Sequence, residues 1–203
     1  RALYALTGHI LHQAHYDETK WLYEKGLSHL MELMRLCHSD NMGVRFEVAF
    51  ILIKLNRDED AYNFIKWWMT IDPDGIYDWG QPPQNTQKGD WLYLENQNVE
   101  EDLLQITGTD YINLHWLAAL TLIKMRMLCK YRLLKSQMRS VKNTITKWNN
   151  DDNQFVYNII QEYLAGNDES QIEEIIKTQT KHIDSYLDQM MNDNKVFVKA
   201  LIN

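Results

Sequence analysis

The sequence predicts an all-α protein, and three observations support that prediction. Only eight Gly and three Pro occur in 203 residues, and all three Pro lie between residues 73 and 83. Residues 110–147 contain neither Gly nor Pro, and apolar residues recur there at helical spacing. Shorter segments of the same spacing fill most of the remaining chain. A chain of this length can bury a core of its own, so we expect one domain over residues 1–203.

The first seventy residues predict four helices with short connections. The first, over residues 2–15, contains Gly8, a small residue at which another helix could approach closely. A polar turn follows the second helix, and Ser39, Asp40 or Asn41 can cap the third. We therefore expect the second to fourth helices at 21–36, 42–55 and 59–70.

Residues 42–74 resemble a tetratricopeptide repeat, the 34-residue helix–turn–helix unit. The matching small, apolar and terminal proline positions are Ala49, Leu52, Ala61, Ile65 and Pro73. Arg45 and Trp68 depart from the pattern, which usually has Trp and Ala there. The resemblance implies helices stacked as antiparallel pairs over residues 1–74, with a weaker repeat at about 2–38.

Some members of the tetratricopeptide class grip a C-terminal carboxylate with Lys and Asn on the first helices of their repeats. Phe46, Glu47 and Phe50 occupy the matching positions here, so that clamp does not carry over. The blocks at 40–45, 67–68 and 77–80 also look like uncharacterised eukaryotic proteins, some of which carry MYND-type zinc fingers elsewhere. That second resemblance implies no enzymatic activity.

For the adjacent residues Trp67 and Trp68, the sequence predicts that one side chain is more deeply buried than the other. Adjacent helical residues point about 100° apart, and Trp68 shares a face with Ala61 and Ile65. We expect Trp68 to be the buried member and Trp67 to lie nearer the loop or the surface.

The helical pattern breaks after the fourth helix. The break contains every Pro together with Trp79 and Trp91, and such aromatic content favours a packed segment over a disordered linker. We expect an ordered, aromatic-rich loop at 75–109. Trp79 and Trp91 are candidates for contact with a partner.

Residues 110–148 predict a long central helix with two stripes. One is apolar: Leu120, Ile123, Met127, Tyr131, Leu134, Met138 and Val141. The other is basic and supplies further partner-binding candidates: Lys124, Arg132, Lys135, Arg139 and Lys142. The whole chain has a formal net charge of −7, and the C-terminal helices expected at 151–203 are acidic. The cations can face a nucleic-acid phosphate backbone or the chain's own acid, and we favour the second.

Catalytic and metal-binding patterns are weak. His9, His12 and His15 are spaced by three, which offsets successive rings by about 60° on a helix, so they are poor candidates for one metal ion. Cys37 and Cys129 are isolated, and we interpret them as small buried side chains. No phosphate-binding Gly loop or cofactor motif is recognisable, and an enzyme is not expected.

The sequence therefore favours a protein-interaction scaffold or adaptor that binds a peptide or a partner helix. A nucleic-acid-associated module using the basic face at 124–142 is the alternative, and a metal-dependent enzyme comes third. No run of apolar residues is long enough to span a membrane, and we expect an intracellular location, cytoplasmic or nuclear.

Overall fold

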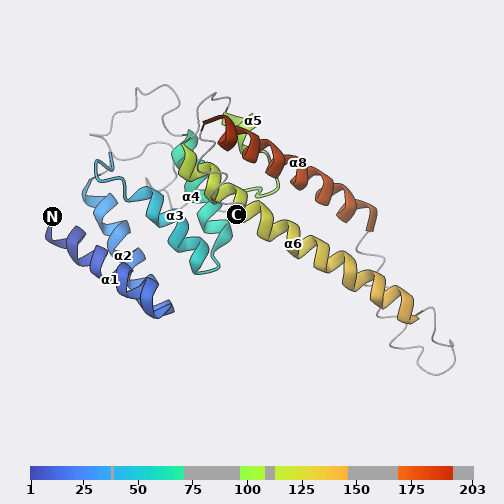
Figure 1. The fold of residues 1–203 in the computed structure, drawn as a ribbon, viewed down its shortest axis with the longest axis horizontal. Coiled ribbons are helices and arrows are strands. Elements are labelled where there is room, and N and C mark those ends of the chain that lie inside the picture. Colours follow the sequence, from blue (N-terminus) through green and yellow to red (C-terminus); the bar gives the residue numbers. More distant parts are fainter. Residues whose placement is uncertain (38, 71–96, 108–112, 146–168, 194–203) are drawn as a thin grey trace. The chain divides into compact units, whose positions relative to one another are not determined.

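The computed structural model describes residues 1–37, 39–70, 97–107, 113–145 and 169–193 (Figure 1). These residues are all-α and contain no strand, which confirms the predicted fold class. The predicted loop around Trp79 and Trp91 and, of the C-terminal helices expected at 151–203, residues 151–168 and 194–203 lie outside the described residues. The described helices are α1 (Ala2–Asp17), α2 (Lys20–Leu36), α3 (Arg45–Lys54), α4 (Asp58–Thr70), α5 (Leu103–Thr107), α6 (Leu114–Ile145) and α8 (Glu169–Asp193).

The chain divides into two compact units, Arg1–Ile123 and Lys124–Asn203, and the division falls within α6. Each unit is described by itself. In the first, consecutive helices pack on one another: α1 on α2, α2 on α3, α3 on α4, and α4 on α5. The tetratricopeptide-like stacking of helical pairs stays a prediction.

Gly26 sets the close approach of α1 and α2. A Cβ at that position would lie 2.3 Å from Leu11 Cδ2, closer than any side chain tolerates. We expected the close approach at Gly8, and that prediction is wrong, because a Cβ at Gly8 would meet nothing within 4 Å. Gly8 lies on the exposed side of α1, whereas Gly26 is buried against it.

The turns on either side of α3 are built by polar residues with left-handed backbone. Asp40 has φ 48° and Gly43 has φ 71°, and the Asp40 carboxylate accepts the N–H groups of Val44 and Arg45, each at 2.9 Å. The N-cap position of α3 is Val44, and of the three predicted caps Asp40 satisfies the start of the helix from the preceding turn by accepting these two N–H groups. After α3, Asn56 adopts φ 59°, and the Arg57 N–H bonds to the Leu52 carbonyl at 2.9 Å, which ends the helix.

Helix α4 is the most deeply buried element of the first unit. Its buried residues are Ala61, Tyr62, Asn63, Phe64, Ile65, Trp67 and Trp68. The prediction that Trp68 is buried is confirmed, with 8% exposure, but Trp67 is more deeply buried, at 2%. A surface position for Trp67 is therefore wrong, and the loop around Trp79 and Trp91, its other expected neighbour, lies outside the described residues.

Residues 97–107 are fastened to α4 through Glu101. Its Oε1 accepts hydrogen bonds from the Tyr62 hydroxyl and the Lys66 ammonium, each at 2.6 Å. Leu103 of α5 is fully buried. This short helix lies within the segment 75–109 that we expected to be an ordered loop.

The described part of the second unit pairs the C-terminal part of α6 with α8. Lys135 forms an ion pair with Glu173, and Arg139 donates to Glu169 at 2.7 Å, so the two helices run antiparallel (Figure 1). Buried residues of α8 recur at helical spacing and form one stripe. They are Ile172, Gln179, Ile183, Tyr186 and Met190.

Candidate functional site

A pocket of about 390 Å³ lies in the first unit among α1, α2, α3 and the start of α6. This volume is within the range of sites that hold one or two side chains or a small ligand. Most of its lining is apolar or aromatic. The lining residues are Leu11, His15, Tyr23, Gly43, Phe46, Glu47, Phe50, Ile51, Lys54 and His115.

Helix α3 contributes more residues to the pocket lining than any other helix, because one of its faces lines the pocket while the opposite face packs in the core. Glu47, Phe50, Ile51 and Lys54 are spaced i, i+3, i+4, i+7, so they form one stripe that lines the pocket. The other face is buried and supplies Val48, Ala49, Leu52 and Ile53 to the core. Phe50 and Ile51 stay half-buried on the pocket face.

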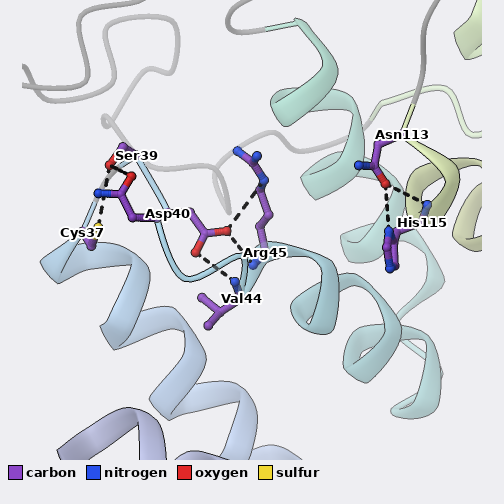
Figure 2. A network of polar contacts seen from close by, with 8 residues as sticks. Cys37, Ser39, Asp40, Val44, Arg45, Asn113 and His115 are labelled. Atoms are coloured by element: carbon purple, nitrogen blue, oxygen red, sulfur yellow. Dashed lines mark hydrogen bonds and ion pairs between the residues drawn. The ribbon is translucent and has the colours of Figure 1, made fainter. Parts of the chain in front are cut away.

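The start of α6 contributes His115, whose ring is fixed from two sides. It stacks on Phe46 with ring centroids 4.8 Å apart and an interplanar angle of 29°. Asn113 Oδ1 accepts the His115 backbone N–H at 2.9 Å and lies 2.9 Å from the ring Nδ1 (Figure 2). Since that oxygen only accepts, the contact with Nδ1 is a hydrogen bond in the tautomer that carries its proton on Nδ1.

Phe46 is held in place by further aromatic and cationic contacts. Its ring lies 4.7 Å from that of Trp116, and the Arg45 guanidinium lies 5.2 Å from its centroid. The same guanidinium lies 4.8 Å from the Trp68 ring. Contacts of this kind are each worth about 0.5–1 kcal/mol at exposed sites. They give the pocket a preorganised aromatic wall.

Asp40 positions Arg45 beneath this wall. Besides accepting two backbone N–H groups, its carboxylate lies 3.7 Å from Arg45 Nε (Figure 2). Burial raises the pKa of Asp40 above its ordinary 3.8, although the N–H groups and the charge of Arg45 oppose the increase. The buried carboxylate therefore fixes the turn and the position of the Arg45 guanidinium, and its burial costs desolvation free energy.

Tyr23 is the deepest polar group of the pocket. Its side chain is 6% exposed, and its buried hydroxyl has no hydrogen-bond partner among the described residues. The Lys54 ammonium lies 5.5 Å from the centroid of its ring. A buried hydroxyl without a partner is costly, so it is a feature that a bound ligand can satisfy.

Glu47 and Lys54 bring opposite charges to the pocket. Neither forms an ion pair with any residue that the structure describes. Partial burial raises the pKa of the Glu47 carboxyl above its ordinary 4.5, and the negative charge of Asp40 raises it further. Perturbed acids in concave sites are frequent at functional positions.

The basic stripe predicted on α6 is only partly available. Lys124 is fully buried, so it cannot contact a partner in this conformation, and its place among the partner-binding candidates is wrong. Its neighbours Leu120, Thr121 and Ile123 on α6 are buried as well. Lys135 is paired with Glu173 and Arg139 with Glu169, both acidic residues of α8 in the expected acidic C-terminal region. Arg132 is exposed, and the Lys142 side chain lies outside the described residues.

The other sequence candidates are not gathered into a site. His9, His12 and His15 are all exposed on α1, and within the described ranges no three His, Cys, Asp or Glu side chains are arranged to hold a metal. Cys37 is half-buried and Cys129 is exposed, so the interpretation of both as buried side chains is wrong. Among the helices that the structure describes, none is long and apolar enough to cross a membrane.

The chain was compared with protein-family models, curated proteins and solved structures, and it matches none of them.

The sequence analysis noted Phe46, Glu47 and Phe50 only as departures from a carboxylate clamp, and it missed Tyr23, Lys54 and His115. The helical repeat of Glu47, Phe50, Ile51 and Lys54 could have indicated the pocket. Phe50 and Ile51 make this face of α3 apolar, although the opposite face already supplies the core.

Proposed function

We propose that the protein is an interaction module that binds a peptide segment of another protein in the pocket on α3. The observation that supports this proposal is the pocket itself, which combines an aromatic wall with a few polar groups at its edges. Peptide-binding sites commonly have this composition, since apolar anchors supply affinity and polar groups supply orientation. A cytoplasmic or nuclear location and a tetratricopeptide-like arrangement are parts of the same proposal.

The contacts of the wall suit a binding role. Phe46 is fixed between His115, Trp116 and the Arg45 guanidinium, so a ligand would not have to order it. Phe50 is half-buried beside it and offers an apolar surface. The Tyr23 hydroxyl adds a buried polar group that a ligand can satisfy.

Selection from a displayed library of random peptides tests the proposal. The full chain should enrich peptides with a shared motif, and Phe50→Ser should abolish their binding because it removes part of the apolar lining. Leu133→Ser is the matched control, since Leu133 is an exposed apolar residue of α6 that does not line the pocket. Circular dichroism should show that both variants are folded. Enrichment of no motif, or binding that survives Phe50→Ser, would refute the proposal.

The nucleic-acid alternative has less support. Of the five cations on the stripe, Lys124 is buried, and Lys135 and Arg139 are paired with acidic residues of α8. Cations that are already neutralised release few counterions from a nucleic acid and so gain little affinity.

A further inference from the structure

Glu47 and Lys54 carry opposite charges at the two ends of the stripe of α3 residues that lines the pocket. Glu47 and Lys54 lie seven residues apart on α3, which is two helical turns and about 10 Å along the axis. Phe50 and Ile51 lie between them on the same face. At that separation the two charges are too far apart to pair with each other.

Charged helical residues usually find a partner one turn away or are fully solvated. On α2 and α4, for example, Lys20 pairs with Glu24 and Arg57 with Asp60. Glu47 and Lys54 are both exposed residues of the pocket lining and have no such partner within the described residues, so their charges are accessible to a ligand. A cation placed near Glu47 would also offset the burial and the repulsion from Asp40 that raise the pKa of this carboxyl.

We propose that the pocket selects a peptide segment in the polyproline II conformation in which a basic and an acidic side chain, three residues apart, flank large apolar residues. The basic side chain meets Glu47, the acidic one meets Lys54, and an apolar side chain enters between Phe46 and Phe50. The spacing follows from geometry, because a polyproline II helix has three residues per turn and rises about 3.1 Å per residue, so side chains three residues apart lie on one face about 9 Å apart. This inference rests on the proposed function and specifies its ligand.

Four capped, fluorescein-labelled peptides test the charge pattern by fluorescence polarisation on the full chain. They contain Lys-Leu-Phe-Asp, Gln-Leu-Phe-Gln, Lys-Leu-Phe-Lys or Asp-Leu-Phe-Asp between Gly-Ser flanks. The mixed-charge peptide should bind about five- to tenfold more tightly than the uncharged one, because each partly exposed ion pair contributes a few-fold at most. Added salt should reduce the difference.

Charge reversal in the pocket should change the preference in a defined way. Lys54→Glu leaves two acidic ends, so the peptide with two Lys should become the best ligand. Glu47→Lys leaves two basic ends and should favour the peptide with two Asp. The controls are Lys20→Glu on α2 and Glu59→Lys on α4, which make the same charge changes outside the pocket and should leave the wild-type ranking intact.

Equal binding of all four peptides, binding of none, or a ranking that ignores the pocket variants would overturn the inference. The library selection described above is independent of this charge pattern. If it yields peptides that require Phe50 but lack the paired charges, the proposed function stands and the inference fails. If it yields no peptide that depends on the pocket, the proposed function fails.

Discussion

Replacing Trp67 by Ala should be among the most damaging single changes in the first unit. The side chain is 2% exposed, and it meets the Trp68 ring edge-on with centroids 5.0 Å apart. A buried Trp removes about 150–250 Å² from water, which at about 25 cal/mol per Å² is roughly 4–6 kcal/mol. Because Ala retains part of that burial, we expect a loss of about 3–5 kcal/mol in the free energy of unfolding.

Urea denaturation followed by far-ultraviolet circular dichroism measures the loss as a lower midpoint at an unchanged slope. The matched control is Trp21→Ala, because Trp21 is 65% exposed and its loss should change stability by less than about 0.5 kcal/mol. If Trp67→Ala does not fold, Trp67→Phe provides a milder test with a smaller loss in the same direction. A loss below about 1 kcal/mol in the free energy of unfolding of Trp67→Ala would show that the Trp67 side chain is not buried.

Three further predictions concern the cap, the pocket acid and the basic stripe. Asp40→Ala should cost about 1–2 kcal/mol in a urea melt, because the Val44 and Arg45 N–H groups lose their acceptor, while Asp40→Asn should cost less; equal losses would contradict the capping role. Glu47→Gln should raise the melting temperature at pH 7 more than at pH 4: a raised pKa means that the folded state favours the protonated acid, so the wild type loses stability as pH rises above 4.5, and Gln does not titrate. A gain that does not vary with pH would count against this assignment. Single-stranded RNA should bind the full chain weakly even at low salt, as judged by fluorescence polarisation, because Lys135 and Arg139 are paired with acids; tight binding that is lost in Arg139→Glu would support the nucleic-acid alternative instead.

The fold class and most described helix positions could be predicted because they depend on local patterns. The turn around Asn56 and the cap at Asp40 follow from the preferences of short polar residues for left-handed backbone and for helix N-termini. These signals lie within a few residues of the structure that they determine, so a single sequence contains them.

Burial on a second face could not be predicted in the same way. Tyr62 and Lys66 of α4 meet a distant partner because Glu101, more than thirty positions away, accepts a hydrogen bond from each. The close contact at Gly26 likewise depends on where Leu11 lies on another helix. Periodicity shows that a helix has an apolar face, but it does not show how many neighbours the helix will have.

The pocket was missed for a related reason. Tyr23, Lys54 and His115 come from three different helices, and only the packing of those helices brings them together. The sequence shows Glu47 and Phe50 at unusual positions for a carboxylate clamp, but it does not show what replaces the clamp. The basic stripe was visible in the sequence, whereas the burial of Lys124 depended on tertiary packing.

The most direct test of the central claim is photo-crosslinking from inside the pocket. A benzophenone amino acid placed at Phe50 should crosslink to a library-selected peptide, and mass spectrometry should locate the bond on an apolar residue of the shared motif. The same group placed at the exposed Leu133 should give no crosslink above background. Equal crosslinking from both positions, or a crosslink from Leu133 alone, would contradict a peptide-binding site on α3.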